Sequence, residues 1–98
     1  MPATTPVDIG SLITRQTGVR GGKPCLSGTS FPVHRVAALY RMGHSADEIA
    51  SMYEHIDLAH VHAAITYYWA NKEEIEYYLR EEERVEREHG LGAMRDAS

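Results

Sequence analysis

Six histidines and one cysteine stand out in this 98-residue sequence as side chains that could bind a metal ion or act as a nucleophile. His60 and His62 are two residues apart, which on a helix places them about 200° apart, so they cannot chelate one ion. No two histidines have the four-residue spacing of a helical metal pair. Cys25 lies in an apolar segment where it is expected to be buried and inert. The sequence therefore predicts no catalytic residue, no metal site and no cofactor; a small metal-dependent enzyme is the most distant alternative.

A glycine pair followed by a lysine could form a phosphate-binding loop, because glycine-rich turns direct backbone amides at anions. Gly21, Gly22 and Lys23 have this order. The Walker spacing, however, needs a glycine where Thr17 stands and a hydroxyl residue where Pro24 stands. The sequence therefore argues against a nucleotide loop of the Walker type.

The composition indicates one small domain with an uneven charge distribution. The net charge is −4, but five basic residues and one acid precede Ala46, whereas five basic residues and thirteen acids follow from there. Such a division predicts one surface for phosphate and another for a basic protein, or else a solvated acidic face. A single cysteine and the lack of a long apolar run predict a cytoplasmic protein with no membrane segment.

The elements that must position these residues centre on the segment 45–71. Ser45 and Glu48 have capping-box spacing for a short helix, and Asp57 can cap a longer helix after a brief break. A short helix, a turn and a longer helix are typical of a helix-turn-helix. Two packed helices without a nucleic-acid role have the same pattern. The apolar stripe of the longer helix is predicted to contain Leu58, Val61, Ile65, Tyr68 and Trp69.

The flanking segments complete a mainly α fold. Two short strands within 12–17 and 23–26 predict an N-terminal β-hairpin, and a helix over 33–42 supports the helix-turn-helix as a three-helix core. An acidic C-terminal helix is predicted from Lys72 to His89, with Asn71 and Glu74 as a second capping box and with Gly90 and Gly92 at its end. The expected organisation is a flexible arm (1–10), a single domain (11–90) and a disordered tail (91–98).

Two binding surfaces follow from this arrangement. We expect DNA contacts from the helix-turn-helix, with phosphates on Arg35 and Arg41 and base edges near His60, His62 and Thr66. We expect protein contacts from the narrow apolar stripe of the acidic helix, formed by Ile75, Tyr78, Leu79 and Val85. The small hairpin and the exposed tyrosines Tyr67 and Tyr77 further predict a homodimer.

The order of these motifs resembles a bacterial family called domain of unknown function 433. The resemblance is carried by GGKP at 21–24, by Gly28 and Thr29, by Pro32 and Val33, and by Gly43, Glu48, Ile49 and Tyr53. Ser27 and Ser30 depart from the family pattern, which has basic residues there. The resemblance implies an antitoxin that neutralises a PIN-like nuclease toxin and binds its own operator DNA. A structural dimerisation or adaptor module without DNA binding is the alternative.

Overall fold

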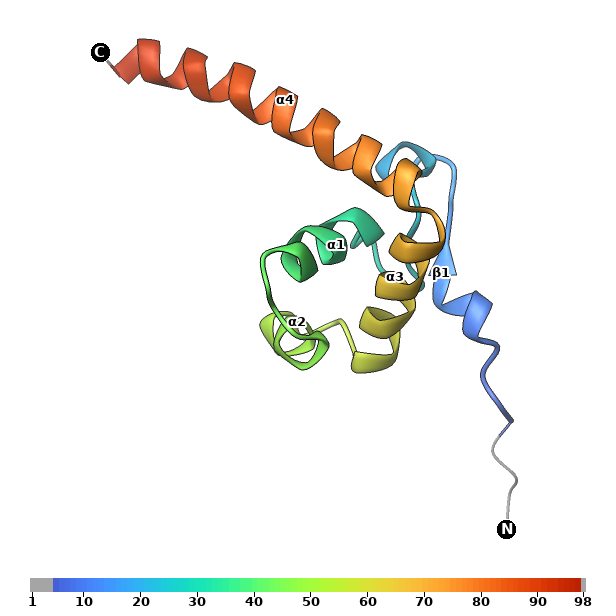
Figure 1. The fold of residues 1–98 in the computed structure, drawn as a ribbon. Helices are drawn as coiled ribbons and strands as arrows, with labels where there is room; N and C mark the ends of the chain where they lie inside the picture. The colour runs from blue at the N-terminus through green and yellow to red at the C-terminus, as the bar shows by residue number, and fades with distance from the viewer. Residues whose placement is uncertain (1–4, 98) are drawn as a thin grey trace.

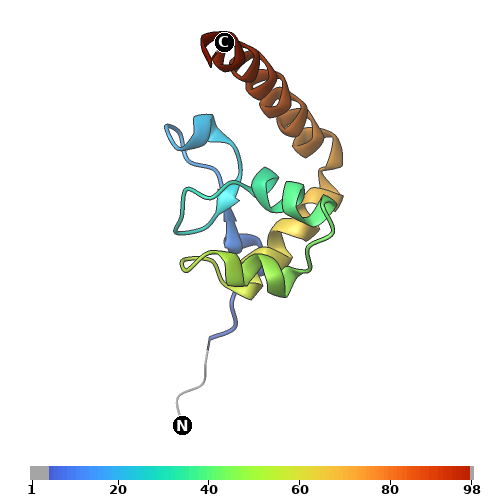
Figure 2. The same ribbon diagram turned by 90° about the vertical axis from the view of Figure 1, so that its left-hand side faces the viewer.

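The chain is mainly helical, and its elements follow the predicted order. The computed structural model describes residues 5–97, with side chains as far as residue 89. Within these residues the α-helices are α1 (Val33–Arg41), α2 (Ala46–Met52), α3 (Leu58–Ala70) and α4 (Lys72–Ala97). Figure 1 shows α1, α2 and α3 grouped together, with α4 running outward from this group to the C-terminus. Figure 2, turned by 90°, also shows α4 extending away from the other helices.

The predicted hairpin is present as a ladder of two residues on each strand. Strand β1 (Ile13–Thr14) runs antiparallel to β2 (Cys25–Leu26), with Ile13 opposite Leu26 and Thr14 opposite Cys25. So short a ribbon is marginal in water, so its stability must come from packing. Leu26 supplies that packing, because its side chain is fully buried in the helical core.

The first helix starts and stops where the sequence predicts. Pro32 stands at its N-cap in an extended conformation, where a missing amide proton does no harm. Val33, Val36 and Ala37 form its buried face. Gly43 follows with φ of 100°, the left-handed conformation that ends many helices and that glycine adopts at little cost.

The pair α2 and α3 is capped by the predicted residues. The Ser45 hydroxyl accepts from the Glu48 amide and the Glu48 carboxylate accepts from the Ser45 amide, which is the expected capping box. Asp57 accepts from the amide of His60 at the start of α3. These bonds involve residues close in sequence, so local chemistry alone determines where both helices begin.

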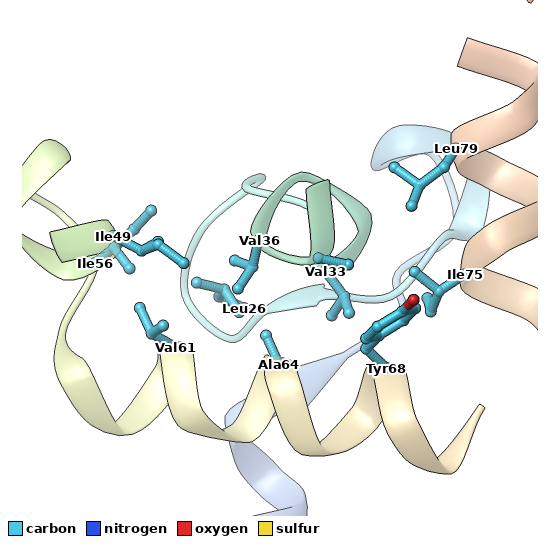
Figure 3. Close-up of a cluster of buried hydrophobic side chains, with 11 residues drawn as sticks. Leu26, Val33, Val36, Ile49, Ile56, Val61, Ala64, Tyr68, Ile75 and Leu79 are labelled. Carbon is cyan, nitrogen blue, oxygen red and sulfur yellow. The ribbon is translucent and has the colours of Figure 1, made fainter. Parts of the chain in front are cut away.

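The apolar core is continuous from the helix-turn-helix to the first turns of α4. Figure 3 shows Ile49, Ile56 and Val61 at one end of the cluster and Ile75 and Leu79 at the other. The middle of the cluster is formed by Leu26, Val33, Val36, Ala64 and Tyr68. The N-terminal strands and the helices α1, α2, α3 and α4 are therefore stabilised by one shared core.

The predicted start of α4 at Lys72 is confirmed, but its predicted capping box and its predicted end are wrong. Asn71 caps the end of α3 instead, with its side-chain amide donating to the Tyr67 carbonyl at 3.2 Å. The Glu74 carboxylate accepts hydrogen bonds from Arg15, Tyr67 and Tyr78 rather than from the backbone amide of Asn71. The helix also continues beyond Gly90 to Ala97. A glycine lowers helix stability by about 1 kcal/mol but does not stop a helix, and residues 93–95 are good helix formers.

The predicted stripe of α3 is correct in its centre and wrong at its ends. Val61 and Tyr68 are buried, whereas Leu58 is 40% exposed and Trp69 is 54% exposed. Adjacent helical residues point about 100° apart, so Tyr68 and Trp69 cannot both face the core. Trp69 lies at the margin instead, where its indole donates to the Tyr40 hydroxyl at 3.3 Å.

The described residues include part of the predicted N-terminal arm. Of the predicted arm, residues 1–4 lie outside the described residues, while Asp8 caps a 3₁₀ helix that spans Ile9–Leu12. The boundaries of the flexible N-terminal arm and of the disordered C-terminal tail stay predictions. Within residues 5–97, no helix is both long enough and apolar enough to cross a bilayer.

Candidate binding surfaces

The helix-turn-helix unit carries a net negative charge, which repels the phosphates of DNA. Asp47, Glu48, Glu54 and Asp57 lie in or beside α2 and its turn, and the sequence has no Lys or Arg between Met42 and Lys72. Nucleic-acid affinity depends mainly on cations that replace counterions at phosphates. The surface of α2 and α3 therefore lacks the positive charges that a nucleic-acid duplex requires, although a short helix, a turn and a longer helix follow one another there.

Of the three predicted base readers, His60 is already engaged within the protein. Its Nδ1 lies 2.6 Å from an Asp57 carboxylate oxygen, and its Nε2 lies 3.0 Å from the Ser27 hydroxyl. Bonds from the His60 backbone and then from its ring lower the pKa of Asp57, which keeps this carboxylate charged. His60 thus ties α3 to the loop after β2, while His62 and Thr66 are exposed.

The two predicted phosphate contacts face α4 instead of lying beside the base readers. Arg35 lies 3.6 Å from a carboxylate oxygen of Glu82. Arg35 and Arg41 line one wall of a hollow of about 420 Å³ between α1 and α4, and Glu83 and Glu86 line it with Glu82. Sequence reasoning missed this arrangement because α1 and α4 are separated by thirty residues of chain. Phosphates approaching these arginines would also meet carboxylates, which repel them.

The predicted partner stripe divides into a packed part and an exposed part. Ile75 and Leu79 are buried in the domain's own core, and Tyr78 is half-buried beside it. Val85 is 39% exposed. The expectation that the whole stripe needs a partner is therefore corrected, because α1 and α3 cover its first half. A partner-binding role for Val85 stays a prediction.

A buried histidine joins α1 to the same point of α4. His34 Nε2 lies 3.0 Å from a Glu82 carboxylate oxygen, while no described residue bonds its Nδ1. Burial lowers the pKa of His34, as do the charges of Lys23 and Arg35, whereas Glu82 raises it. The Tyr78 ring packs 5.8 Å away, centre to centre. This junction joins α1 to α4 beyond the apolar contacts of Ile75 and Leu79.

A second polar cluster anchors the N-terminal strand to α3 and α4. The Glu74 carboxylate accepts from Arg15, from the Tyr67 hydroxyl at 2.9 Å and from the Tyr78 hydroxyl at 2.8 Å. Burial alone would raise the pKa of Glu74, but the bonds from Arg15, Tyr78 and Tyr67 lower it overall. No sequence signal links Arg15 to Glu74, which lies 59 residues away. The cluster explains why Tyr67, predicted to be exposed, is half-buried.

The chemistry of the remaining candidates is limited. Cys25 is 2% exposed, and burial raises the pKa of its thiol, so a reactive thiolate is disfavoured. Among the residues that the structure describes, no three His, Cys, Asp or Glu side chains are grouped as metal ligands would be.

These features define a small helical domain that joins a β-hairpin, a helix-turn-helix and a projecting acidic helix. The chain belongs to the DUF433 family, described as "Protein of unknown function", whose model matches residues 13–68. Its structure is similar to the crystal structure of a DUF433 member protein from Anabaena variabilis ATCC 29413, with 27% sequence identity and a TM-score of 0.66. The match covers 71% of this chain and 69% of the other. Among curated proteins, none matches this chain.

Proposed function

We propose that this chain is an antitoxin-like, non-enzymatic protein that neutralises a PIN-like nuclease toxin through the projecting part of α4. One observation carries the proposal. Every α4 side chain from Glu83 to His89 is exposed, whereas the first turns of the same helix are packed in the core. An isolated helix of such length is marginal in water, and a binding partner would stabilise it. We call residues 83–89 the acidic arm.

The charges of the acidic arm favour a basic partner. Arg84 is bonded to Glu81 and Glu88, and Glu82 is shared by His34 and Arg35. These contacts leave Glu83 and Glu86, which line the hollow against α1, as the carboxylates best placed to meet a partner. A nuclease cleft that holds RNA phosphates has positive potential, so carboxylates on a helix suit it.

The test is to coexpress this chain with any small PIN-like nuclease that is found to be encoded beside its gene. We expect a stable complex in which RNA cleavage falls as the chain is added. Glu86→Lys should weaken the complex, because it reverses a charge in the acidic arm. Glu54→Lys is the matched control, since it makes the same change at an exposed residue of the α2–α3 turn. The proposal fails if no such neighbour binds, or if both variants bind alike.

Homodimerisation belongs to the same proposal and has its own support. Trp69 is 54% exposed beside Tyr40 and Lys72, whose ammonium lies 5.4 Å from the centre of the indole ring system. Exposed tryptophan and tyrosine side chains are enriched at protein interfaces. Sedimentation should show a dimer that Trp69→Ser dissociates. A monomer at all concentrations would remove dimerisation from the proposal and would also contradict the adaptor alternative.

Binding to operator DNA is the weaker part of the proposal. The order of α2 and α3 supports it, but their acidic charge and the carboxylates opposite Arg35 and Arg41 weigh against it. If DNA is bound through phosphates, affinity must fall steeply with salt, and the slope must decrease in the double variant Arg35→Ala and Arg41→Ala. Operator binding without this dependence would exclude the two arginines as phosphate contacts.

A further inference from the structure

A hollow on a different face of the domain has the opposite charge character from the α1–α4 hollow. It measures about 310 Å³, a size that suits a small ligand, and lies where the loop after β2 meets the turn between α2 and α3. Its lining includes Arg20, Ser30, Phe31, Tyr53 and His55, and no Asp or Glu. An anion that entered it would meet a cation without meeting a carboxylate.

Arg20 is held toward this hollow in an unusual way. Its backbone has φ of 50°, and it is the sole non-glycine residue with positive φ in the described part of the chain. Left-handed backbone is unfavourable for arginine and persists where the surroundings enforce it. The Arg20 Nε donates to the Ser30 carbonyl at 3.0 Å, which fixes the guanidinium beside the loop.

The free hydrogen-bond donors of this hollow match a phosphate group. Arg15, Arg35 and Arg84 are paired with carboxylates, but among residues 5–89, whose side chains the structure describes, no carboxylate pairs with Arg20 and its terminal NH₂ groups have no acceptor. Gly28 and Ser30 also line the hollow, and their backbone amides are likewise without acceptors in this part of the chain. Guanidinium and backbone amides together are the usual donors to phosphate.

Two aromatic rings offer a surface for a planar group next to these donors. Phe31 and Tyr53 pack edge to face, with ring centres 4.7 Å apart and planes at 61°. Tyr53 remains 36% exposed. The Thr29 hydroxyl donates to the Leu26 carbonyl and accepts from the Phe31 amide, which holds the loop in place. Bases stack on aromatic side chains of this kind in proteins that bind single strands.

We propose that this hollow binds a nucleotide, with its phosphate on Arg20 and the loop amides and its base on Tyr53. His55, which lines the same hollow and is exposed, supplies a further ring N–H donor for the phosphate. The site is separate from the acidic arm, so it stands whether or not the arm binds a toxin. The nucleotide is either free or part of a single-stranded RNA.

The test is an NMR titration of the ¹⁵N-labelled chain with GMP, AMP and inorganic phosphate. We expect saturable shifts at residues 28–31 and 53–56, with at least one nucleotide binding more tightly than phosphate. Arg20→Gly should weaken nucleotide binding about tenfold, the usual effect of losing a charged hydrogen bond, and glycine tolerates the left-handed backbone. Tyr53→Leu should weaken it by about the same factor through lost stacking.

The control variant is Arg80→Gln, which removes an exposed arginine of α4 and should leave nucleotide affinity unchanged. Thermal unfolding by circular dichroism verifies that each variant is folded. Equal affinities for phosphate and nucleotide, or binding that is insensitive to both Arg20→Gly and Tyr53→Leu, would overturn the assignment. A short single-stranded RNA that binds more tightly than GMP or AMP at the same amides identifies RNA as the source; equal or weaker binding identifies the free nucleotide.

Discussion

The two parts of α4 differ in their surroundings far more than in their sequence. Both parts combine glutamates and arginines with occasional apolar residues. In the first part Ile75 and Leu79 are buried against α1 and α3, whereas in the acidic arm Val85 is 39% exposed. The comparison teaches that an apolar stripe predicts a contact without predicting whether the contact is internal.

Truncating an apolar residue in each part should give the largest difference. Ile75→Ala leaves a cavity in the core and should lower the free energy of unfolding by about 2–5 kcal/mol. Val85→Ala should change it by less than about 0.5 kcal/mol, because no core surrounds that residue. Chemical denaturation of both variants measures the difference. Equal losses would mean that the arm is packed as firmly as the first turns.

Replacing Glu74 should have the next largest effect. Glu74→Ala removes the acceptor shared by Arg15, Tyr67 and Tyr78 and should cost roughly 1–3 kcal/mol, mainly because the two half-buried tyrosine hydroxyls lose their partner. Glu73→Ala is the matched control at an exposed neighbour. Denaturation midpoints of the two variants provide the measurement, and equal midpoints would show that the cluster adds nothing to stability.

The junction of His34 and Glu82 predicts a pH dependence of stability. Because the pKa of His34 is lowered in the folded protein, the unfolded chain binds its proton at a higher pH than the folded chain does. His34 therefore contributes full stability above the ordinary value of 6.5, and this contribution falls as the pH decreases below it. Unfolding midpoints measured from about pH 7.5 to about pH 5.5 should decrease.

The variant His34→Gln should reduce that decrease, because glutamine does not titrate. His62→Gln, at an exposed position of α3, should retain it and serves as the control. Lys23, Arg35, Tyr78 and Glu82 surround His34 and remain in both variants. An unchanged pH dependence in His34→Gln would assign the effect to another group.

The smallest effect on stability is expected in the acidic arm. Arg84→Ala removes the exposed pairs with Glu81 and Glu88, and such pairs are screened by water and salt. The unfolding midpoint should therefore not change measurably. A clear shift would indicate that the acidic arm contributes to the fold, which would weaken its assignment as a free binding surface.

Local chemistry explains what the sequence could predict. The capping box of Ser45 and Glu48 and the cap at Asp57 involve residues three positions apart, so their bonds form in any fold that keeps the helices. The hairpin was predictable because extended residues are bounded by glycine turns, and β1 and β2 lie within the predicted strands. Mainly helical architecture and family followed from the same patterns.

Contacts distant in sequence account for what could not be predicted. Glu74 was expected to cap its own helix, but its carboxylate accepts a hydrogen bond from Arg15, the residue that follows β1. Arg35 and Arg41 were expected to meet phosphates, yet the path of α4 places carboxylates opposite them. The pairing of these groups depends on how helices pack, which helical periodicity does not specify. The proposed nucleotide site likewise joins two loops that the sequence separates.

The exposure of residues 83–89 has a consequence for the lifetime of the protein in a cell. A helical segment without tertiary contacts opens locally at little free-energy cost, and proteases cleave chains that have opened. Degradation should therefore begin in the acidic arm, unless a bound partner covers it. The amount of this protein would then depend on how much of its partner is present. An exposed helix would in this way couple the concentrations of two proteins.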